Sequence, residues 1–431
     1  MEKVGPVVIV AYYWPPSGGP AVQRWLDLTY EFCSLGVDCT VVIPARPYYP
    51  QLDPSLASSI HPNLNIIRVR GWEPLRLFHG LSKGSTRNLS KGLLPKQRTS
   101  ILYRISAWIR GNVFFPDARI FWSIAVYFKL RRKFQMLTSS TLITTGPPHS
   151  LHIIGLWLKK QHREVKWVAD LRDPIADLGY LSALPLLKRT RRYHQRFERA
   201  ILTTASAITT TSFALKDLFQ KRYFAGIPID CIPNGFQGVA NPNTSPPKDF
   251  ILTHVGSLFS HRDSVIIWNA LTDLIDCEEG FGSQLQIRFV GEVDSEVVLS
   301  LEHRDLLKYC VFEGYKNREQ CEQFERDSAI LLLLESTLSG YQYAIPGKTF
   351  SYLKARRPIL AIGPEVWDVK EILGETSGHL VTTADKERTF EFIYDLYLKF
   401  KSKQFPVVDT TIDTFSRSNT ALMYIDRISK L

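Results

Sequence analysis

The sequence predicts an α/β protein made of two doubly wound, Rossmann-like domains with parallel sheets. Short apolar, often β-branched runs alternate with stretches of helical periodicity along the chain, which is typical of parallel strands joined by helices. A Gly-, Pro- and Asn-rich stretch at 235–249 divides this alternation into two series. We therefore expect an N-terminal domain over 1–234, a linker over 235–249 and a C-terminal domain over 250–400, with a ligand cleft between the domains.

The first series begins with the β-branched run VVIVA at 7–11, which predicts a buried strand. The loop after it holds two adjacent glycines, Gly18 and Gly19, and a helical pattern follows. We expect long loops with little regular structure over 45–100, where Pro, Ser and Lys are frequent. The other predicted strands are 37–44, 141–145, 165–169, 207–211 and 229–233, and the helices are 21–35, 101–109, 120–137, 151–161, 193–202 and 213–224.

The second series has the same alternation, and we expect residues 401–431 to form a helical tail that returns toward the N-terminal domain. The predicted strands are 251–255, 285–290, 311–313, 330–334, 359–362 and 379–382, and the helices are 264–274, 295–307, 318–325, 369–373 and 384–401, with a further one opening near residue 348.

Composition excludes several classes of protein. The six cysteines are scattered without a CxxC pair or a compact Cys/His cluster, so we expect free thiols and no zinc site. The first residues carry no apolar signal segment, and no run of 18 apolar residues occurs. We expect a cytoplasmic protein that does not span a membrane.

The positive charge is concentrated in one region. The net charge is +11, and residues 68–135 hold 15 Lys or Arg against two acids, Glu73 and Asp117, interleaved with aromatic residues. This mixture suits the surface of an anionic membrane, and we expect peripheral contact there. A solvated basic face is the alternative, and nucleic acid is disfavoured because no nucleic-acid-binding signature accompanies the charges.

The turn Ile345-Pro346-Gly347-Lys348 stands between two apolar runs that predict parallel strands. A Pro-Gly pair before a helical pattern places the positive end of a helix at the carboxyl edge of the sheet, with the Lys348 ammonium beside it. Such a turn suits a diphosphate, although an ordinary strand-to-helix turn has the same pattern. The loop at Gly18 and Gly19 has similar features, but it is not GxGxxG and so does not predict a dinucleotide site.

Six motifs occur in order from Tyr12 to Leu360: YYxPPxGGxxxxR, TGPPHS, ADxRDP, IPNGF, HxGSLxxxR and IPGKxFxYLxxxxPIL. On these motifs the chain resembles glycosyltransferase family 4, retaining enzymes of GT-B architecture that transfer a sugar from a nucleotide diphosphate sugar. The resemblance implies two Rossmann-like domains that face each other across a cleft.

The resemblance also implies site residues. Gly18 and Gly19 would present backbone N–H groups to the diphosphate, while Arg262 and Lys348 would neutralise the leaving group. Other donor-binding positions would be Gly256, Ser257, Glu335, Gly347 and Ser351. No Asp-x-Asp pair is present, so we expect neither a metal nor another cofactor, and a front-face reaction in which the leaving phosphate takes the acceptor's proton.

The sequence departs from the family at several positions. Two glutamates that many members carry are Tyr343 and Ser351 here, and the usual Gly-Arg is Gly256-Ser257. Arg172 lies near the place of a histidine that contacts the donor sugar. Three further candidates each have two interpretations. Asp173 either binds acceptor hydroxyls or pairs with Arg172, and Glu335 either binds a sugar hydroxyl or caps a helix. His149 either lies near the cleft or makes a structural hydrogen bond. Arg24 completes the first motif and is a further candidate for contacting the acceptor or donor sugar.

The leading hypothesis is a sugar transferase of bacterial surface-glycan or lipopolysaccharide synthesis. It would act on a glycan or lipid-linked acceptor at the inner face of the cytoplasmic membrane. A catalytically silent protein that binds a nucleotide sugar or a partner is the alternative, because Tyr343 and Ser351 replace the usual glutamates.

Overall fold

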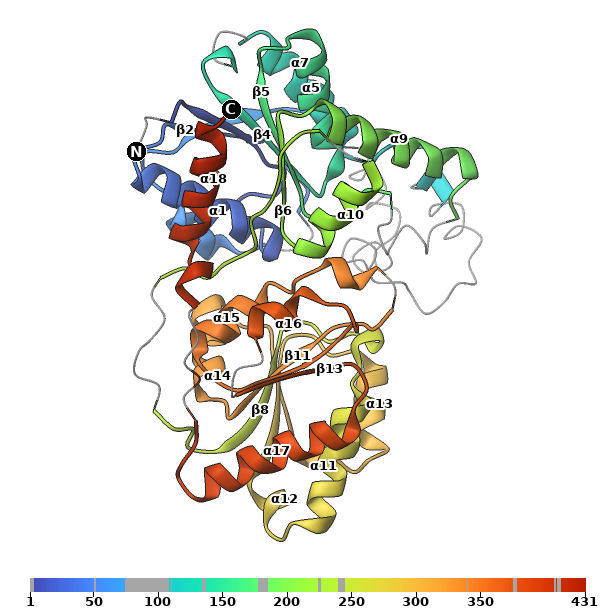
Figure 1. The fold of residues 1–431 in the computed structure, drawn as a ribbon, viewed down its shortest axis with the longest axis vertical. Helices are drawn as coiled ribbons and strands as arrows, with labels where there is room; N and C mark the ends of the chain where they lie inside the picture. The colour runs from blue at the N-terminus through green and yellow to red at the C-terminus, as the bar shows by residue number, and fades with distance from the viewer. Residues whose placement is uncertain are drawn as a thin grey trace. The chain divides into compact units, whose positions relative to one another are not determined.

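The computed structural model divides the chain into two compact units (Figure 1). Unit 1 comprises Met1–Pro233 and Arg417–Leu431, and unit 2 comprises Asn234–Ser416. The structure describes residues 4–49, 52–73, 108–109, 111–133, 137–176, 185–223, 226–238, 245–338, 340–374, 378–406, 408 and 412–431. Residues 101–107 of the expected helix 101–109 and about half of the basic, aromatic region 68–135 therefore lie outside the described residues.

Unit 1 is built on a parallel sheet with the strand order β3-β2-β1-β4-β5-β6-β7. Its central strands are buried on both faces, which is why they are runs of Val, Ile, Ala and Thr with no polar alternation. The strands are β1 (Val7–Val10), β2 (Cys39–Pro44), β3 (Asn65–Val69), β4 (Thr141–Gly146), β5 (Lys166–Leu171), β6 (Ala207–Thr210) and β7 (Ile229–Cys231).

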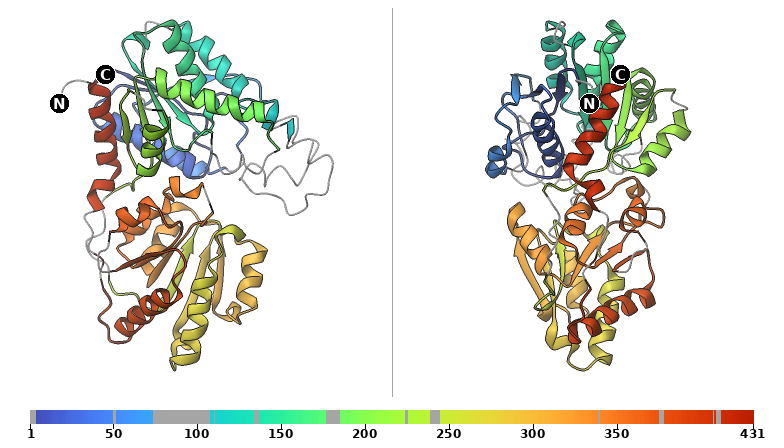
Figure 2. Two further views of the ribbon diagram at one scale, coloured as in Figure 1. Left: turned by 45° about the vertical axis from the view of Figure 1, so that its right-hand side comes forward. Right: turned by 60° about the vertical axis from the view of Figure 1, so that its left-hand side comes forward.

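Helices cover both faces of this sheet (Figure 2). The C-terminal helix α18 packs on α1, and both lie over the face that carries Val7 and Ile9. On the opposite face α7 packs against α5 and α9. The helices of unit 1 are α1 (Pro20–Ser34), α5 (Ile120–Arg131), α7 (His152–Gln161), α9 (Lys188–Thr204), α10 (Phe213–Tyr223) and α18 (Arg417–Ser429).

Unit 2 holds a second parallel sheet with the order β10-β9-β8-β11-β12-β13. The strands are β8 (Phe250–Val255), β9 (Leu285–Val290), β10 (Cys310–Gly314), β11 (Ile330–Leu334), β12 (Ile359–Ile362) and β13 (His379–Thr382). The helices are α11 (Val265–Cys277), α12 (Phe281–Gln284), α13 (Ser295–Glu302), α14 (Arg318–Asp327), α15 (Lys348–Ala355), α16 (Asp368–Leu373) and α17 (Lys386–Lys401).

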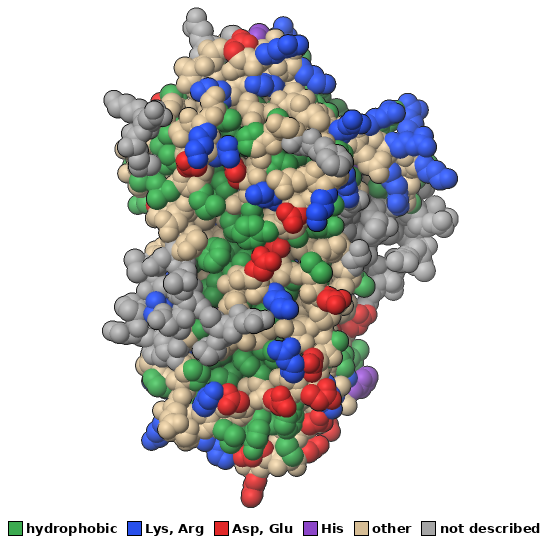
Figure 3. Space-filling model, in the orientation of Figure 1, with side chains coloured by type: hydrophobic (Ala, Val, Ile, Leu, Met, Phe, Trp, Pro, Cys, Tyr) green, Lys and Arg blue, Asp and Glu red, His purple; other side chains and the backbone are tan. Residues whose placement is uncertain are grey.

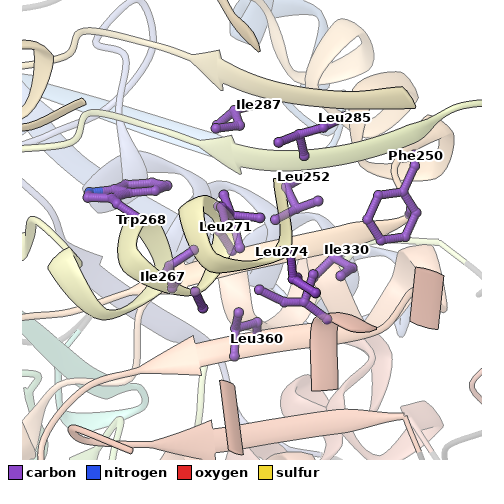
Figure 4. Close-up of a cluster of buried hydrophobic side chains, with 14 of the residues drawn as sticks. Phe250, Leu252, Ile267, Trp268, Leu271, Leu274, Leu285, Ile287, Ile330 and Leu360 are labelled. Atoms are coloured by element: carbon purple, nitrogen blue, oxygen red, sulfur yellow. The ribbon is translucent and has the colours of Figure 1, made fainter. Parts of the chain in front are cut away.

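Alternate residues of each strand in unit 2 enter two different cores. Leu332 packs with Trp268 and other residues of α11 in one core, part of which Figure 4 shows. Its neighbours Leu331 and Leu333 pack with Phe350 of α15 in the other core. The sheet is thus sandwiched between helices, as the continuous apolar runs predict. Within the described residues, no helix is long and apolar enough to cross a bilayer.

The strand orders define where ligands bind in such sheets. In unit 1 the chain passes from β1 to β2 on one side of β1 and later enters β4 on its other side. In unit 2 the chain likewise passes from β8 to β9 on one side of β8 and later enters β11 on its other side. Doubly wound sheets bind ligands at this switch point, beyond the carboxyl ends of the two strands.

Several predictions of local structure were wrong. The expected loop over 45–100 contains a 3₁₀ helix, Pro54–Ser59, and the edge strand β3. Only Val69 of β3 is buried, so its sequence lacks the apolar signal of the central strands. The predicted helix 120–137 ends at Arg131 and the predicted helix 295–307 ends at Glu302, while α9 begins five residues before the predicted start.

A buried polar network joins the C-terminal helix to unit 1. The Asp170 carboxylate accepts hydrogen bonds from Tyr424 Oη (2.7 Å), Thr145 Oγ1 (2.7 Å), Thr209 Oγ1 (3.0 Å) and Trp25 Nε1 (3.1 Å). Burial raises the pKa of Asp170, but the guanidinium groups of Arg24 and Arg172, together with these hydroxyls, outweigh it and lower the pKa.

Arg24 belongs to this network, which corrects its assignment to a sugar. Its side chain is 1% exposed and its guanidinium donates to the carbonyls of Ile232 (2.8 Å) and Pro233 (3.1 Å), besides pairing with Asp170 (3.4 Å). A guanidinium enclosed in this way cannot reach a substrate. Arg24 instead holds the end of β7 and α18 together at the point where the chain leaves unit 1.

Asp170→Asn removes the carboxylate and leaves Arg24 without its buried counter-ion. We expect the free energy of unfolding of unit 1 to fall by roughly 3–5 kcal/mol, measured by urea unfolding followed through tryptophan fluorescence. Lys430→Gln, one residue beyond the end of α18, breaks the exposed pair with Asp426 and is the control, with a change within about 0.5 kcal/mol. Equal effects of the two substitutions would contradict the role given to Asp170.

Candidate functional site

The switch point of unit 2 gathers charged side chains from three segments. Arg262 follows β8 in the 3₁₀ turn Ser260–Arg262, Glu335 follows β11, and Lys348 opens α15. Arg262 Nε lies 2.7 Å from Glu335 Oε1. Glu335 Oε1 also accepts from the N–H of Ser336 at 2.9 Å, so this carboxylate is held in place by both partners.

Lys348 is held by an imidazole, since no carboxylate forms an ion pair with it among the described residues. Its Nζ lies 3.1 Å from His254 Nε2. The other ring nitrogen, His254 Nδ1, lies 3.0 Å from the carbonyl oxygen of Leu332 and must donate to it, because a carbonyl only accepts. This leaves Nε2 as an acceptor for the ammonium. His254 is fully buried, and burial together with Lys348 keeps its pKa well below the ordinary value.

The environment of Lys348 disfavours its charge. Burial lowers the pKa of Lys348 to about 7, and Arg262 adds to this effect while Glu335 and Glu325 oppose it. The site therefore holds two cations and one carboxylate that is already paired with Arg262. An anion that arrives here would restore the charge of Lys348 and supply the missing counter-ion.

Gly256 and Gly347 leave room around the lysine. A side chain at Gly256 would place its Cβ 3.4 Å from Lys348 Nζ, and Gly256 has a positive φ of 101° that favours glycine. Its N–H donates to the Val290 carbonyl at 2.7 Å, so Gly256 contributes space and its N–H is already occupied. A Cβ at Gly347 would contact nothing within 4 Å, so the amino end of α15 is open. Ser257 lies beside Gly256 in the same loop.

Ser351 makes its contacts away from Lys348 Nζ. Its hydroxyl donates to Glu325 Oε1 of α14 at 2.8 Å. Glu325 is buried, and burial raises its pKa to about 8, with Glu322 acting in the same direction. A carboxyl group from the neighbouring helix therefore lies beside residue 351. Glu325 could not be predicted from the sequence, because its contact with Ser351 depends on how α14 packs against α15.

Unit 1 has its own group of candidates at the carboxyl ends of β1, β4 and β5. Gly19 precedes α1 with φ 96°, and no side chain caps the amino end of this helix. Gly18 stands before it in the loop after β1. His149 follows β4, is 3% exposed, and neither ring nitrogen has a hydrogen-bond partner among the described residues. Burial, with His152 and Arg172 nearby, lowers the pKa of His149 well below its ordinary value.

Arg172 and Asp173 do not form the ion pair that was expected. Arg172 Nε donates to the Gly146 carbonyl at 2.8 Å, and no salt bridge within 4.0 Å joins these two described residues. Burial lowers the pKa of Arg172 and raises that of Asp173, although each group counteracts the shift of the other. Arg172 thus lies beside the loop that carries His149. Among the described residues, the Asp173 carboxyl group has no ionic partner within 4.0 Å.

Two site features have no sequence prediction behind them. His254 opens the motif HxGSLxxxR, but no role was predicted for it from the sequence. It lies in β8, and its partner Lys348 is 94 residues further along the chain. Glu325 lies within a charged helix. In the described ranges no three His, Cys, Asp or Glu side chains come together in a group able to hold a metal ion.

Comparison with known proteins identifies the architecture. The chain matches no family model and no curated sequence. Among solved structures it resembles an E. coli trehalose-6-phosphate protein bound to UDP-2-fluoro glucose (TM-score 0.63, 11% identity, 99% of each chain covered). It also resembles S. aureus TarM with UDP, fondaparinux and α-GlcNAc-glycerol (TM-score 0.61, 10% identity, 98% of this chain and 99% of that chain). The galactosyltransferase WaaB of the lipopolysaccharide outer core is a third (TM-score 0.58, 13% identity, 99% and 100%).

The chain has the GT-B fold. This confirms the predicted class of two Rossmann-like parallel-sheet domains. At 10–13% identity these comparisons concern the fold only. Within that fold, unit 2 brings together Arg262, Lys348, Glu335 and Gly256, and unit 1 brings together His149 and Arg172.

The substitution Lys348→Met tests whether burial lowers the pKa of Lys348, through the pH dependence of the free energy of unfolding. Below pH 7 wild-type Lys348 is charged in the folded and the unfolded state, so its burial penalty is complete. Between pH 7 and 10.5 the unfolded state binds more protons, so wild-type stability rises with pH relative to the variant. We expect the variant's gain in free energy of unfolding to be largest at about pH 6 and smaller at about pH 9.

The control is Lys354→Met on the same helix, where Lys354 pairs with Glu322 at 2.9 Å. Its difference from wild type should not change over the same pH range. A difference for Lys348→Met that is constant with pH would show that Lys348 keeps an ordinary pKa.

Proposed function

We propose that the protein is a retaining glycosyltransferase that moves a sugar from a nucleotide diphosphate sugar to a glycan or lipid-linked acceptor. One observation supports the proposal most strongly. Lys348 and Arg262 both lie at the switch point of unit 2, and the carboxylate paired there, Glu335, contacts Arg262 and not Lys348. The GT-B fold supports it, because similar folds are bound to UDP-2-fluoro glucose and to UDP. The six motifs of family 4 supply the donor class and the stereochemistry.

The leaving diphosphate determines the roles in unit 2. The bond between the sugar's anomeric carbon and the phosphate oxygen breaks, and negative charge develops on the phosphate. Lys348 and Arg262 neutralise that charge, Lys348 as a point charge and Arg262 through its fork of N–H donors. These two cations take the part of a metal ion, so the reaction is metal-independent. Gly256, Ser257 and Gly347 form the walls around the phosphates.

The remaining residues contact the sugar, the nucleotide or the acceptor. Glu335 accepts from a sugar hydroxyl with the oxygen that Arg262 does not occupy, and Ser351 with Glu325 lies toward the nucleotide. From unit 1, Gly18 and Gly19 offer N–H groups to the diphosphate, and His149, Arg172 and Asp173 contact the sugar or the acceptor. The acceptor hydroxyl forms the new bond on the same face, and its proton passes to the leaving phosphate oxygen.

A surface glycan or lipopolysaccharide is the product class we propose, with the enzyme peripheral on the inner face of the cytoplasmic membrane. WaaB, whose name is that of a lipopolysaccharide galactosyltransferase, has the same fold over the whole chain.

The second candidate is a catalytically silent protein that binds a nucleotide sugar. The Ser351–Glu325 contact favours it, since Ser351 is engaged by a neighbouring helix.

An activity assay separates these candidates. Wild type is screened with UDP-, GDP- and ADP-sugars by thermal stabilisation, where a ligand at 100 times its Kd stabilises by about 2.7 kcal/mol. With the donor so found, we expect Lys348→Ala to lower the rate of sugar transfer or donor hydrolysis about 10²- to 10³-fold. The control Lys354→Ala, one and a half turns along α15, keeps the rate. Donor binding without turnover in wild type would support the silent protein.

The pH dependence of UDP binding tests the contact between Lys348 and the diphosphate. Because about half of Lys348 is neutral near pH 7, binding must add a proton, and we expect UDP affinity to fall as pH rises from 7 to about 9. Calorimetry in buffers of different ionisation enthalpy measures the proton uptake. Lys348→Arg keeps a permanent charge and should remove the pH dependence. An equal pH dependence in this variant would assign the proton to another group.

A further inference from the structure

Helix α9 presents one strongly basic face. Its buried side is formed by Thr190, His194, Phe197, Glu198, Ile201 and Leu202. Its exposed side carries six cations, Lys188, Arg189, Arg191, Arg192, Arg196 and Arg199. In Figure 3 Lys and Arg side chains gather on unit 1 where Figure 1 labels α9.

Hardly any negative charge balances this face. Glu198 is the single acid of α9 and is fully buried, where it accepts from Tyr223 Oη (2.7 Å) and pairs with Arg222 (3.3 Å). Within the described part of the chain, no carboxylate lies within 4.0 Å of the six exposed cations of α9. Surface charges that serve only solubility are usually mixed in sign, so an unbalanced row of this length indicates an anionic partner.

A groove runs along the same face. It has a volume of about 520 Å³ and is lined by Arg192, Gln195, Arg196 and Arg199 of α9 and by Arg222 and Tyr223 of α10. The four α9 residues follow the i, i+3, i+4, i+7 spacing of one helix face. Guanidinium forks arranged along a groove bind phosphate groups in two-point geometry.

Exposed apolar side chains lie at the amino end of the helix. Leu187 is 50% exposed, and Trp108 is 43% exposed. Asn112 fixes them to one another, because its side chain accepts from the N–H of Leu187 at 2.9 Å and donates to the carbonyl of Trp108 at 3.0 Å. Val113, next to Asn112, is 58% exposed. A row of cations beside exposed apolar side chains offers charge to lipid phosphates and apolar surface to the boundary of the acyl chains.

We propose that the α9 face, consisting of α9, the end of α10 and the residues Trp108, Asn112 and Val113, docks on the surface of an anionic lipid bilayer. The cations meet the lipid phosphates, and Leu187, Trp108 and Val113 enter the boundary between headgroups and acyl chains. Clusters of four to eight Lys or Arg on an amphipathic helix bind anionic lipid in this way. Nucleic acid offers the same phosphates, but it gives no favourable environment for the aliphatic Leu187 and Val113.

This inference stands on unit 1 alone and does not need the proposed sugar transfer to be correct. It assigns the row of cations to α9, outside the region 68–135 from which the sequence predicted membrane contact, while the apolar residues Trp108 and Val113 lie inside that region. It also bears on the acceptor of the proposed transfer, because an enzyme bound to a bilayer through this face would meet acceptors that are themselves anchored in the bilayer.

Vesicle sedimentation tests the proposal with the full chain. We expect wild type to bind phosphatidylcholine vesicles that contain phosphatidylglycerol, and to bind pure phosphatidylcholine vesicles weakly. Arg192→Gln/Arg196→Gln removes two cations and should weaken binding to the anionic vesicles roughly 30-fold. The control Lys308→Gln/Arg388→Gln removes two exposed cations of unit 2 and should leave binding unchanged. Leu187→Ser should weaken binding without altering its dependence on salt.

Each contrary outcome overturns the proposal. These are equal binding to neutral and anionic vesicles, unchanged binding of the Arg192/Arg196 variant, or an oligonucleotide that binds more tightly than the vesicles and displaces the protein from them. Binding of inorganic phosphate in the groove without vesicle binding would also overturn it. Urea unfolding of each variant, followed through tryptophan fluorescence, is measured in parallel as a check of folding. Vesicle binding with no sugar transfer in wild type would contradict the proposed function and leave this inference intact.

Discussion

The contact between Lys348 Nζ and His254 Nε2 is the interaction on which the candidate site depends. A buried lysine is normally neutralised by a carboxylate, but here the neighbouring carboxylate Glu335 is paired with Arg262. The imidazole lone pair orients the ammonium without cancelling its charge. His254 can do this because the Leu332 carbonyl fixes its tautomer from inside the sheet. The ammonium of Lys348 is therefore held beside the end of β8 without a negatively charged partner of its own among the described residues, so an anionic ligand can pair with it.

The two units use buried charge in opposite ways. In unit 1 the Asp170 carboxylate is surrounded by donors from α1, β4, β6 and α18, and every one of its contacts is internal. Such a network stabilises the fold and offers nothing to a ligand. In unit 2 the cations outnumber the carboxylates at the switch point, which costs stability. Binding sites commonly reduce the stability of the fold, because their side chains are arranged for a ligand and not for one another.

The fold was predictable because it depends on local patterns. Buried parallel strands such as Ile330–Leu334 are continuous apolar runs, and their alternation with helices fixes the architecture. Strand β3 escaped prediction because it is an edge strand with one buried residue. Arg262 and Lys348 were predictable because motifs mark them. A motif also marks His254, but its contact with Lys348 was not predictable. Neither were Glu325 and the true place of Arg24, since the partners lie 94, 26 and up to 400 residues away in the sequence.

The most direct test of the central claim is a crystal structure of the protein with bound UDP. The account predicts the diphosphate within hydrogen-bond distance of Lys348 Nζ and of the Arg262 guanidinium, with His254 still bonded to Leu332. A diphosphate bound elsewhere, with Lys348 still held by His254 alone, would contradict it.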